Sequence, residues 1–506
     1  MSDIDEKVAP RREERLGAGC VYGGNACGLK AQFGGCRLKA NQRGFGQGSI
    51  CQLLPGTAML STLPNSVVIL HGSLGCGGAI NLQTANVRYR QILSGERNPQ
   101  GAIWMTSNLD ERDVVSGGEE KLEKAILAAE QRFRPATIIV VATCVPGIIG
   151  DDIDGVAARL QPQIQARILP IHCEGFKTQI MATAYDAIFH SISRHLLPRG
   201  EGEGQAPVIV DELEIARERI RRSRLVNLMN FASMSASEQG ELTRLLQALG
   251  LTVQVFPCYS DPERFVDATQ AALSISSCPT HDDYFLKHLQ ERYGVPYILR
   301  HMPIGIAATG DWLRDIARFF HLEKEAEALI AQETRELEEA LAPFRAAFAG
   351  KKALVSAGEV RAFATAAFLQ ELGLSIVAVR PYHYDEFGEP SLDRLTEKQD
   401  DVIVNVATIQ PYETLNIFEK TRPDLYMGHI ADNVWAAKAG VPVVPIWHGG
   451  FSSAGYSGAF DLARRINRVL RNPSFNRRLR ENLKQPYRKE WFHEDPFKYI
   501  REAVTN

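Results

Sequence analysis

Several cysteines and one histidine of this 506-residue chain stand where short apolar runs of the sequence end. Glycine, proline or polar residues follow closely after each of them, and the six residues are Cys76, Cys144, Cys173, Cys258, Cys278 and His448. Iron–sulfur clusters are held by cysteine thiolates, and a thiolate is favoured beside backbone amides and helix N-termini. Glycine-rich turns such as HGSLGCGG also let the backbone approach a bulky inorganic group closely. The pattern indicates metal ligands, and the alternative is a set of buried structural cysteines at sheet edges.

The spacing of the nine cysteines excludes two common kinds of metal site. No CxxC pair occurs, so the sequence contains neither a zinc ribbon nor a ferredoxin-type run. The candidate ligands are instead spread along most of the chain. This spread predicts clusters that are held between domains and at a subunit interface.

Short, β-branched apolar runs alternate with helix-length segments from about residue 50 onward. Runs such as TIIVVATC, KALVSAG and VPVVPIW are nearly continuous in apolar residues, which is typical of strands buried on both faces of a parallel sheet. The alternation predicts βαβ units, and therefore an α/β protein with three Rossmann-like domains. In such sheets ligands bind beyond the carboxyl ends of the strands, where the candidate cysteines stand.

Three sets of these units follow an N-terminal extension. The extension, residues 1–45, shows no periodicity and contains Cys20, Cys27 and Cys36. We expect the three domains at residues 46–215, 216–350 and 351–506, separated by the stretch LLPRGEGEGQAP and by a long charged helical segment. The polar and aromatic C-terminal tail of the third domain either packs on another subunit or forms a surface helix.

The composition excludes several classes of protein. Hydrophobic residues make up 45% and charged residues 23%, as in an ordinary globular protein, and the net charge of −3 gives no basic surface for nucleic acid. No apolar run reaches the roughly 18 residues of a membrane span, and the N-terminus lacks the apolar core of a secretory signal. We therefore expect a cytoplasmic protein. No GxGxxG follows a predicted strand, which argues against a plain nucleotide- or sugar-binding α/β protein. No Walker A motif occurs either, so any ATP hydrolysis would have to take place on a partner.

Six strings of the sequence, taken in order, resemble motifs of the nitrogenase component 1 family. They are LHGSLGCGGA, ATCVPGIIGDDIDGV, HCEGFK, CPTHDDYFLKHLQERYGVPY, RPDLYMGH and GVPVVPIWHGGFSSAGYSGAFDLARRI. Each string alone is moderately specific, whereas the ordered set is strongly specific. The resemblance runs from about Ile50 to Leu470.

The resemblance implies two metal sites. In the family an eight-iron P-cluster, of the [8Fe-7S] type, is held between subunits, and the matching ligands here are Cys51, Cys76 and Cys144. Cys20, in GCVYGG, is the alternative to Cys51 but would require a long insertion. The family's iron–sulfur cofactor is held by one cysteine and one histidine, which match Cys278 and His448. Retention of both implies an α-like catalytic subunit.

Departures from the family's motifs bear on the substrate. A histidine near the reactive face of dinitrogen reducers is matched by Tyr185, and a neighbouring glutamine by Met181. The lysine that helps to hold homocitrate is matched by Asp432, whose charge would repel a tricarboxylate. Arg361 either faces the cofactor as a hydrogen-bond donor or forms an ordinary ion pair. Met181 and Tyr185, together with Phe176, predict a pocket that is less polar than a dinitrogen site.

The chain therefore looks most similar to the catalytic subunit of nitrogenase-like methylthio-alkane reductases, which cleave small alkyl sulfides to methanethiol and a hydrocarbon. Tyr185 would be a candidate proton donor, and Met181 and Arg361 would complete the reactive face. The heterometal and any organic ligand of the cofactor stay open. The implied partners are a β-like subunit, in a heterotetramer of two α-like and two β-like chains, and an ATP-hydrolysing iron protein. The alternatives are a dinitrogen-reducing α subunit, disfavoured by Tyr185 and Asp432, and a scaffold for cofactor assembly, disfavoured by His448.

Overall fold

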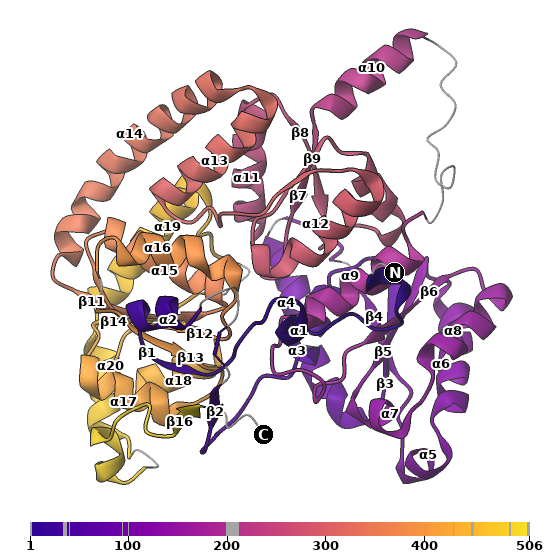
Figure 1. The fold of residues 1–506 in the computed structure, drawn as a ribbon, viewed down its shortest axis with the longest axis horizontal. Coiled ribbons are helices and arrows are strands. Elements are labelled where there is room, and N and C mark those ends of the chain that lie inside the picture. The colour runs from indigo at the N-terminus through magenta and orange to yellow at the C-terminus, as the bar shows by residue number, and fades with distance from the viewer. Residues whose placement is uncertain are drawn as a thin grey trace.

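The computed structural model describes residues 3–33, 38–39, 41–93, 95–99, 101–198, 212–399, 401–428, 430–446, 450–484 and 487–502. Within these residues the chain forms three α/β lobes, each built on its own sheet (Figure 1). The predicted α/β fold with parallel sheets is confirmed. No helix among the described residues is long and apolar enough to cross a membrane.

The first lobe contains a four-stranded parallel sheet in the order β4 (Ile103–Thr106), β3 (Ser66–His71), β5 (Thr137–Ala142), β6 (Arg167–His172). Its helices are α3 (Leu53–Leu60), α4 (Gly78–Leu93), α5 (Glu111–Ser116), α6 (Glu119–Phe133), α7 (Cys144–Ile149), α8 (Ile153–Leu160) and α9 (Thr183–His195). Val67 and Ile69 pack with α6 and α8, whereas Val68 and Leu70 pack with α3 and α9. Because helices cover both faces of the sheet, its central strands are apolar at nearly every position.

The second lobe contains a smaller parallel sheet in the order β10 (Tyr297–Ile298), β9 (Leu273–Ile275), β7 (Leu225–Met229), β8 (Thr252–Phe256). Its helices are α10 (Glu212–Ser223), α11 (Ala236–Ala248), α12 (Pro279–Tyr293), α13 (Ile306–Phe320) and α14 (Glu323–Phe348). A further helix, α19 (Gly455–Leu470), comes from the segment expected in the third domain and packs against α14, α11 and α13. The chain therefore returns to the second lobe near its C-terminal end.

The third lobe contains a six-stranded sheet in the order β1 (Tyr22–Asn25), β13 (Ile403–Val406), β12 (Ser375–Pro381), β11 (Lys352–Ala357), β14 (Leu425–Gly428), β15 (Val443–Pro445). Its strands are parallel except for β1, which is an antiparallel edge strand. The helices of this lobe are α15 (Glu359–Glu371), α16 (Glu389–Thr396), α17 (Pro411–Thr421), α18 (Ile430–Lys438) and α20 (Ser474–Asn482).

The N-terminal residues differ from the irregular extension that the sequence indicates. They form α1 (Arg12–Arg15), β1, α2 (Ala26–Gln32) and β2 (Asn41–Arg43), and β2 pairs with β16 (Ile500–Glu502) near the C-terminus. The strand sequence YGGN carries no apolar alternation, because an edge strand is added by backbone hydrogen bonds rather than by side-chain burial. The C-terminal tail packs on its own lobe, where the ring of Trp491 lies 5.5 Å from that of Tyr412 in α17.

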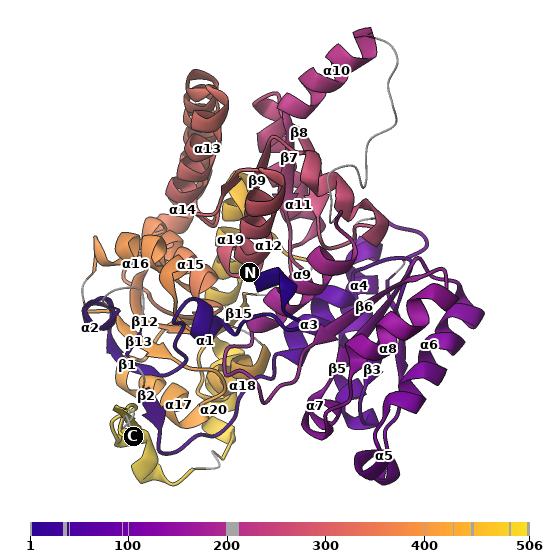
Figure 2. The same cartoon turned by 45° about the vertical axis from the view of Figure 1, so that its right-hand side comes forward.

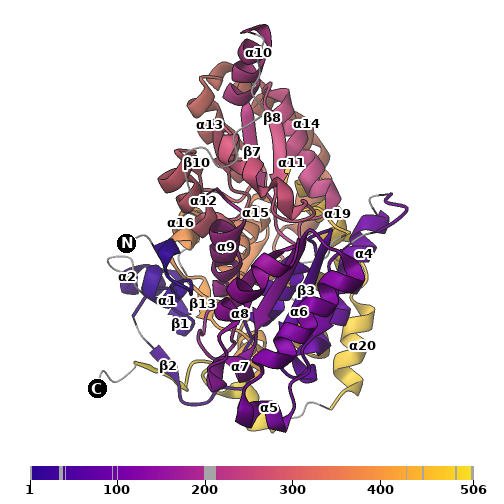
Figure 3. The same ribbon diagram turned by 90° about the vertical axis from the view of Figure 1, so that its right-hand side faces the viewer.

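The three lobes meet around α1. Figure 2 shows α1 beside α9 of the first lobe and α15 of the third lobe, and Figure 3 shows α9 directly below α12 of the second lobe. The carboxyl ends of β9, β11 and β12 lead into segments that reach this junction. The junction therefore gathers strand ends from separate sheets, which is where the sequence predicts the ligands.

Candidate active site

A cavity of about 290 Å³ lies at the junction of the three lobes. Its volume is near the lower end of the range for small-molecule sites. Four residues that the sequence singles out line it together, and these are Met181, Tyr185, Cys278 and Arg361. Much of the remaining wall is apolar, with Leu54 and Ala58 from α3 on one side and Ile446 on another.

Cys278 joins β9 to α12 and is the N-cap residue of that helix, with extended backbone angles and Pro279 in the first turn. Its thiol accepts hydrogen bonds from the backbone amides of Thr280 and His281. Trp312 of α13, which is fully buried, holds the end of β9 by donating from Nε1 to the Ser276 carbonyl at 3.1 Å. Burial raises the pKa of Cys278 to about 12, although the charge of Arg361 and the two amides act in the opposite direction. A bound metal would deprotonate this thiol.

Tyr185 lies in the first turn of α9, and Met181 precedes that helix by two residues. The Tyr185 ring centroid is 4.2 Å from that of His281. Burial, and then the nearby Cys278 and Cys258, raise the pKa of Tyr185 above its ordinary value of 10. The Tyr185 hydroxyl is therefore a weaker acid here than in water, which argues against its candidate role as a proton donor.

Arg361, in the first turn of α15, is buried with only 9% of its surface exposed. Its guanidinium carbon lies 4.8 Å from the centroid of the Phe231 ring. Among the described residues, its Nη2 atom has no hydrogen-bond partner and its side chain forms no ion pair. The side chain thus offers donors toward the cavity, which favours the first of the two interpretations of Arg361.

Two histidines that the sequence analysis did not single out also line the cavity, and they are His281 and His383. The His281 ring stacks on Phe231 at 5.0 Å, and its Nδ1 has no hydrogen-bond partner within the described part of the chain. The signal for His281 was its position three residues after Cys278, because residues three apart share a helix face. Phe176, which was expected near the pocket, is instead 55% exposed, and the aromatic ring that packs behind the lining residues His281 and Arg361 is that of Phe231.

Cys51, Cys76 and Cys144 form a second group at one side of the first lobe. Cys51 precedes α3, Cys76 lies in the turn before α4, and Cys144 is the first residue of α7. Burial, and then Cys144 and Cys76, raise the pKa of Cys51, so the three thiols interact electrostatically. Cys51 is exposed and the other two are half-buried, which leaves the group accessible from outside.

Gly175 provides the space for this group of thiols. A Cβ atom at residue 175 would lie 2.4 Å from Cys51 Sγ and 3.6 Å from Cys144 Sγ. Cys20 makes different contacts, since its thiol donates to Gln179 Oε1 at 3.1 Å and its side chain packs against the small apolar cluster of Ala18, Ile180 and Ala182. These contacts favour Cys51 over Cys20 as the third member of the group.

The other cysteines have varied surroundings. Cys173 is buried beside Cys51 and Cys144, and its pKa is raised well above 9 by burial. Cys258 is also buried, which raises its pKa to about 12, and Cys27 is exposed in α2. Cys36 lies outside the described residues.

His448 also lies outside the described residues, two positions after Ile446 of the cavity wall. Asp432 is buried and forms an ion pair with Arg380 at 2.9 Å. Because Arg380 compensates its charge, the argument that Asp432 would repel a tricarboxylate loses its force.

The residues present fit the two iron–sulfur groups that the sequence predicts. Three thiols converge at an accessible surface, and a glycine leaves room beside them. In the cavity, one thiol stands at a helix N-terminus near buried donor atoms of Arg361 and His281 that have no hydrogen-bond partner in the described chain. Sulfide and other anionic ligands accept hydrogen bonds from such donors.

The chain is similar to known proteins over most of its length. The family model described as nitrogenase component 1 type oxidoreductase matches residues 51–471. The iron-molybdenum cofactor biosynthesis protein NifE of Rippkaea orientalis is 28% identical over 87% of this chain and 91% of its own. The nitrogenase molybdenum-iron protein alpha chain of Methanosarcina barkeri is 25% identical over 82% of this chain and 84% of its own.

A solved structure of nitrogenase Cp1 at pH 6.5 has the same fold, with a TM-score of 0.72 and 20% identity over 96% of this chain and 99% of that one. Family membership implies iron–sulfur clusters. The family model spans most of the chain, and the relatives include a molybdenum-iron protein alpha chain and NifE proteins. The chain therefore belongs to the nitrogenase component 1 family of oxidoreductases, as an α-like subunit.

Proposed function

We propose that this chain is the catalytic subunit of a reductase that cleaves the C–S bond of small methylthio-alkanes, giving methanethiol and a hydrocarbon. The observation that carries the proposal is the largely apolar cavity, in which Cys278 and Arg361 lie with Met181 and Tyr185. An apolar wall binds an alkyl sulfide better than a polar wall would, because burial of the methyl and alkyl groups supplies the binding energy. Arg361 would orient an anionic ligand or sulfide through its unpartnered nitrogen.

Two metal groups belong to the proposal. Cys51, Cys76 and Cys144 would hold a P-cluster-type [8Fe-7S] cluster, and Cys278 with His448 would hold a nitrogenase-type iron–sulfur cofactor. When bound, these groups would supply low-potential electrons to the cavity. The apolar residues around Leu54 and Ile446 would exclude water from it.

Two partners complete the proposed enzyme. The accessible face that carries Cys51 would be covered by a β-like subunit in a heterotetramer. An iron protein would hydrolyse ATP and deliver the electrons. Each cleavage consumes two electrons and two protons, since one proton ends on carbon and the other on sulfur.

A scaffold for cofactor assembly is the second candidate, favoured by the 28% identity to NifE. A scaffold would bind the cofactor, pass it on and catalyse no turnover. The cavity does not separate the two candidates, because both must hold a cluster. A dinitrogen-reducing α subunit is a third candidate, favoured by the 25% identity to the molybdenum-iron protein alpha chain.

The test is anaerobic purification with the β-like subunit, followed by metal analysis and substrate assays with the iron protein. Dimethyl sulfide and 2-methylthioethanol should yield methanethiol, and dinitrogen should yield no ammonia. Ammonia without methanethiol would overturn the substrate assignment. If the purified complex contained iron, reduced no substrate and transferred its cofactor to an acceptor protein, the scaffold function would be supported.

Cysteine variants test the two metal sites separately. Cys278→Ala should remove only the cofactor from the cavity, whereas Cys76→Ala should remove only the intersubunit cluster. Cys258→Ala is the matched control, because this cysteine is buried but is not a proposed ligand. Full metal content in both ligand variants would contradict the assignment.

A further inference from the structure

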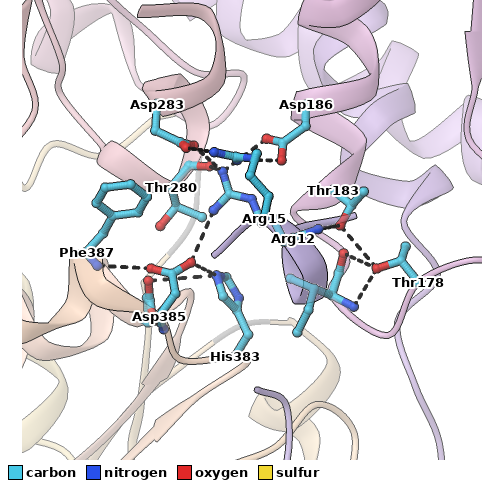
Figure 4. Close-up of polar contacts among 12 residues, drawn as sticks. Arg12, Arg15, Thr178, Thr183, Asp186, Thr280, Asp283, His383, Asp385 and Phe387 are labelled. Carbon is cyan, nitrogen blue, oxygen red and sulfur yellow. Dashed lines mark hydrogen bonds and ion pairs between the residues drawn. The ribbon is translucent and has the colours of Figure 1, made fainter. Parts of the chain in front are cut away.

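Behind one wall of the cavity lies a buried group of three ionisable side chains, Glu359, His383 and Asp385. Glu359 begins α15, and the other two follow β12. His383 Nε2 lies 3.9 Å from Glu359 Oε1 and 3.7 Å from Asp385 Oδ2, and the side chains are 0–2% exposed. Figure 4 shows His383 and Arg12 both beside Asp385, where they contact the same carboxylate oxygen, Oδ2. His383 also lines the cavity, so the group has one side open to the reacting space.

The charges around this group do not balance if both carboxyls are ionised. Arg12 and Arg15 each pair with Asp186 and Asp283, which makes two guanidinium groups for two carboxylates. Asp385 receives a longer contact from Arg12 Nη1 at 3.4 Å. Among the described residues, His383 is the only basic side chain within ion-pair distance of Glu359. An ionised Glu359 would thus be a buried negative charge in excess.

Glu359 is the member of the group whose surroundings most favour the protonated form. Burial, and then the charge of Asp385, raise the pKa of Glu359 well above its ordinary value. For Asp385, contacts from Glu359, His383 and Arg12 outweigh burial and lower the pKa. Burial lowers the pKa of His383 to about 4, so the imidazole is neutral. The charge balance and these directions together favour a proton on Glu359 rather than on Asp385, beside a neutral His383.

Two atoms of the group face each other without a hydrogen-bond partner. They are Glu359 Oε1 and His383 Nε2, and neither has a partner among the described residues. The second oxygen of Glu359 is engaged, since it accepts from the backbone amide of Asp385 at 2.6 Å. Buried polar groups are almost always paired, and unpaired ones occur where function needs them. This pair adjoins a cavity at which the proposed reaction consumes protons.

We propose that Glu359 and His383 form a proton relay that opens onto the cavity, with Asp385 orienting the imidazole. The inference rests on the proposed reductase function, in which an iron protein supplies the electrons. In each transfer the O–H bond of Glu359 breaks and the proton binds to one ring nitrogen of His383. The other ring nitrogen releases a proton to the substrate carbon or sulfur. The imidazole is neutral before and after the transfer, and Glu359 regains its proton from solvent between turnovers.

A bound divalent cation is the competing occupant, because one ligand atom from each residue lies within 4.8 Å of the others. The guanidinium of Arg12 beside Asp385 disfavours a second cation there. The charged and titratable groups that face His383 are Glu359 from α15, Arg12 from α1, Asp283 and His281 from α12, and Asp385. The pH dependence of the reaction rate would therefore report the coupled titration of all these groups and not of one residue.

The first experiment measures the proton itself. The complex with its β-like subunit should show an infrared C=O band of a buried carboxylic acid that shifts in D2O and is lost in Glu359→Gln. Glu389→Gln, a change at an exposed residue of the same lobe, should keep the band. Absence of a band specific to Glu359 would overturn the proposal. Metal analysis gives the second outcome that would overturn the proposal. If the wild-type complex bound one additional equivalent of divalent metal and Glu359→Gln lost it, the group would be a cation site.

The second experiment measures turnover. His383→Gln and Glu359→Gln should lower kcat about 100-fold at unchanged iron content, with KM altered less than about threefold, whereas Glu359→Asp should recover part of the rate. Wild-type kcat in His383→Gln would overturn the relay. If the wild-type complex releases no methanethiol but shows the Glu359 band, the proposed function has failed while the proton site stands.

Discussion

Arg12 Nη2 lies 3.1 Å from Asp186 Oδ1, and both side chains are fully buried. The same guanidinium contacts Asp283 of α12 and Asp385 after β12, so one N-terminal side chain joins carboxylates of all three lobes (Figure 4). Asp186 adjoins Tyr185, and Asp283 lies in the helix that Cys278 caps. Arg12 therefore fixes the walls of the cavity relative to one another.

Arg12→Met should lower the free energy of unfolding by about 3–5 kcal/mol, because it leaves buried carboxylates without their partner. Urea unfolding of the purified chain checks this value. Arg11→Met is the matched control, since Arg11 and its partner Glu14 are both about half exposed, and it should cost at most about 1 kcal/mol. Equal losses in the two variants would show that the buried network contributes little.

Gly175→Ala should displace the Cys51 thiol, because the new Cβ would lie 2.4 Å from Cys51 Sγ. The expected result is loss of intersubunit iron while the cofactor site near Cys278 keeps its metal, as measured by iron analysis of the complex. Gly240→Ala in α11 is the control, since no atom lies within 4 Å of the added Cβ and alanine favours a helix. Normal iron content in Gly175→Ala would argue against Cys51 as a ligand.

His172 should make stability depend on pH. Burial alone would lower its pKa, but hydrogen bonds with Asp154 and Glu174 raise the pKa from 6.5 to about 9. The folded state therefore binds a proton that the unfolded state releases earlier, which stabilises it by on the order of 3 kcal/mol. This contribution is fully present below about pH 6.5 and is lost as the pH rises through about 9.

His172→Gln should accordingly lower the unfolding midpoint in urea at pH 6 much more than at pH 9.5. His321→Asn serves as the control, because His321 is exposed and asparagine tolerates its left-handed backbone. An effect of His172→Gln that is the same at both pH values would disprove the protonated pair.

Tyr185→Phe should keep kcat for alkyl sulfides within about threefold of the wild type, because burial raises the pKa of its hydroxyl and makes it a poor acid. Tyr185→Ala should raise KM, since it removes the ring that lies 4.2 Å from His281 and enlarges the cavity. Steady-state release of methanethiol distinguishes the two effects. A loss of kcat in Tyr185→Phe as large as that in Glu359→Gln would make Tyr185 the proton donor instead.

The sequence allowed the first lobe to be predicted almost strand by strand. The run TIIVVATC, for example, became β5 because both faces of that strand are covered and its apolar pattern is therefore unbroken. The N-terminal strand β1 could not be predicted, because Gly23 and Gly24 contribute backbone pairing and no side-chain pattern. The packing of α19 on the second lobe could not be predicted either. An amphipathic pattern shows that one face of a helix is buried, but it does not show which element that face packs against.

The sequence by itself determined the α/β class, the family and the strand-end positions of Cys76, Cys144 and Cys278, because these depend on local patterns and ordered motifs. Tertiary structure alone decided which of these residues meet. It brought Cys51 rather than Cys20 to the thiol group, paired Asp432 with Arg380, and placed His281 and His383 in the wall of the cavity. These relationships join residues far apart in the chain, and their distances are set by how three separate sheets pack around Arg12.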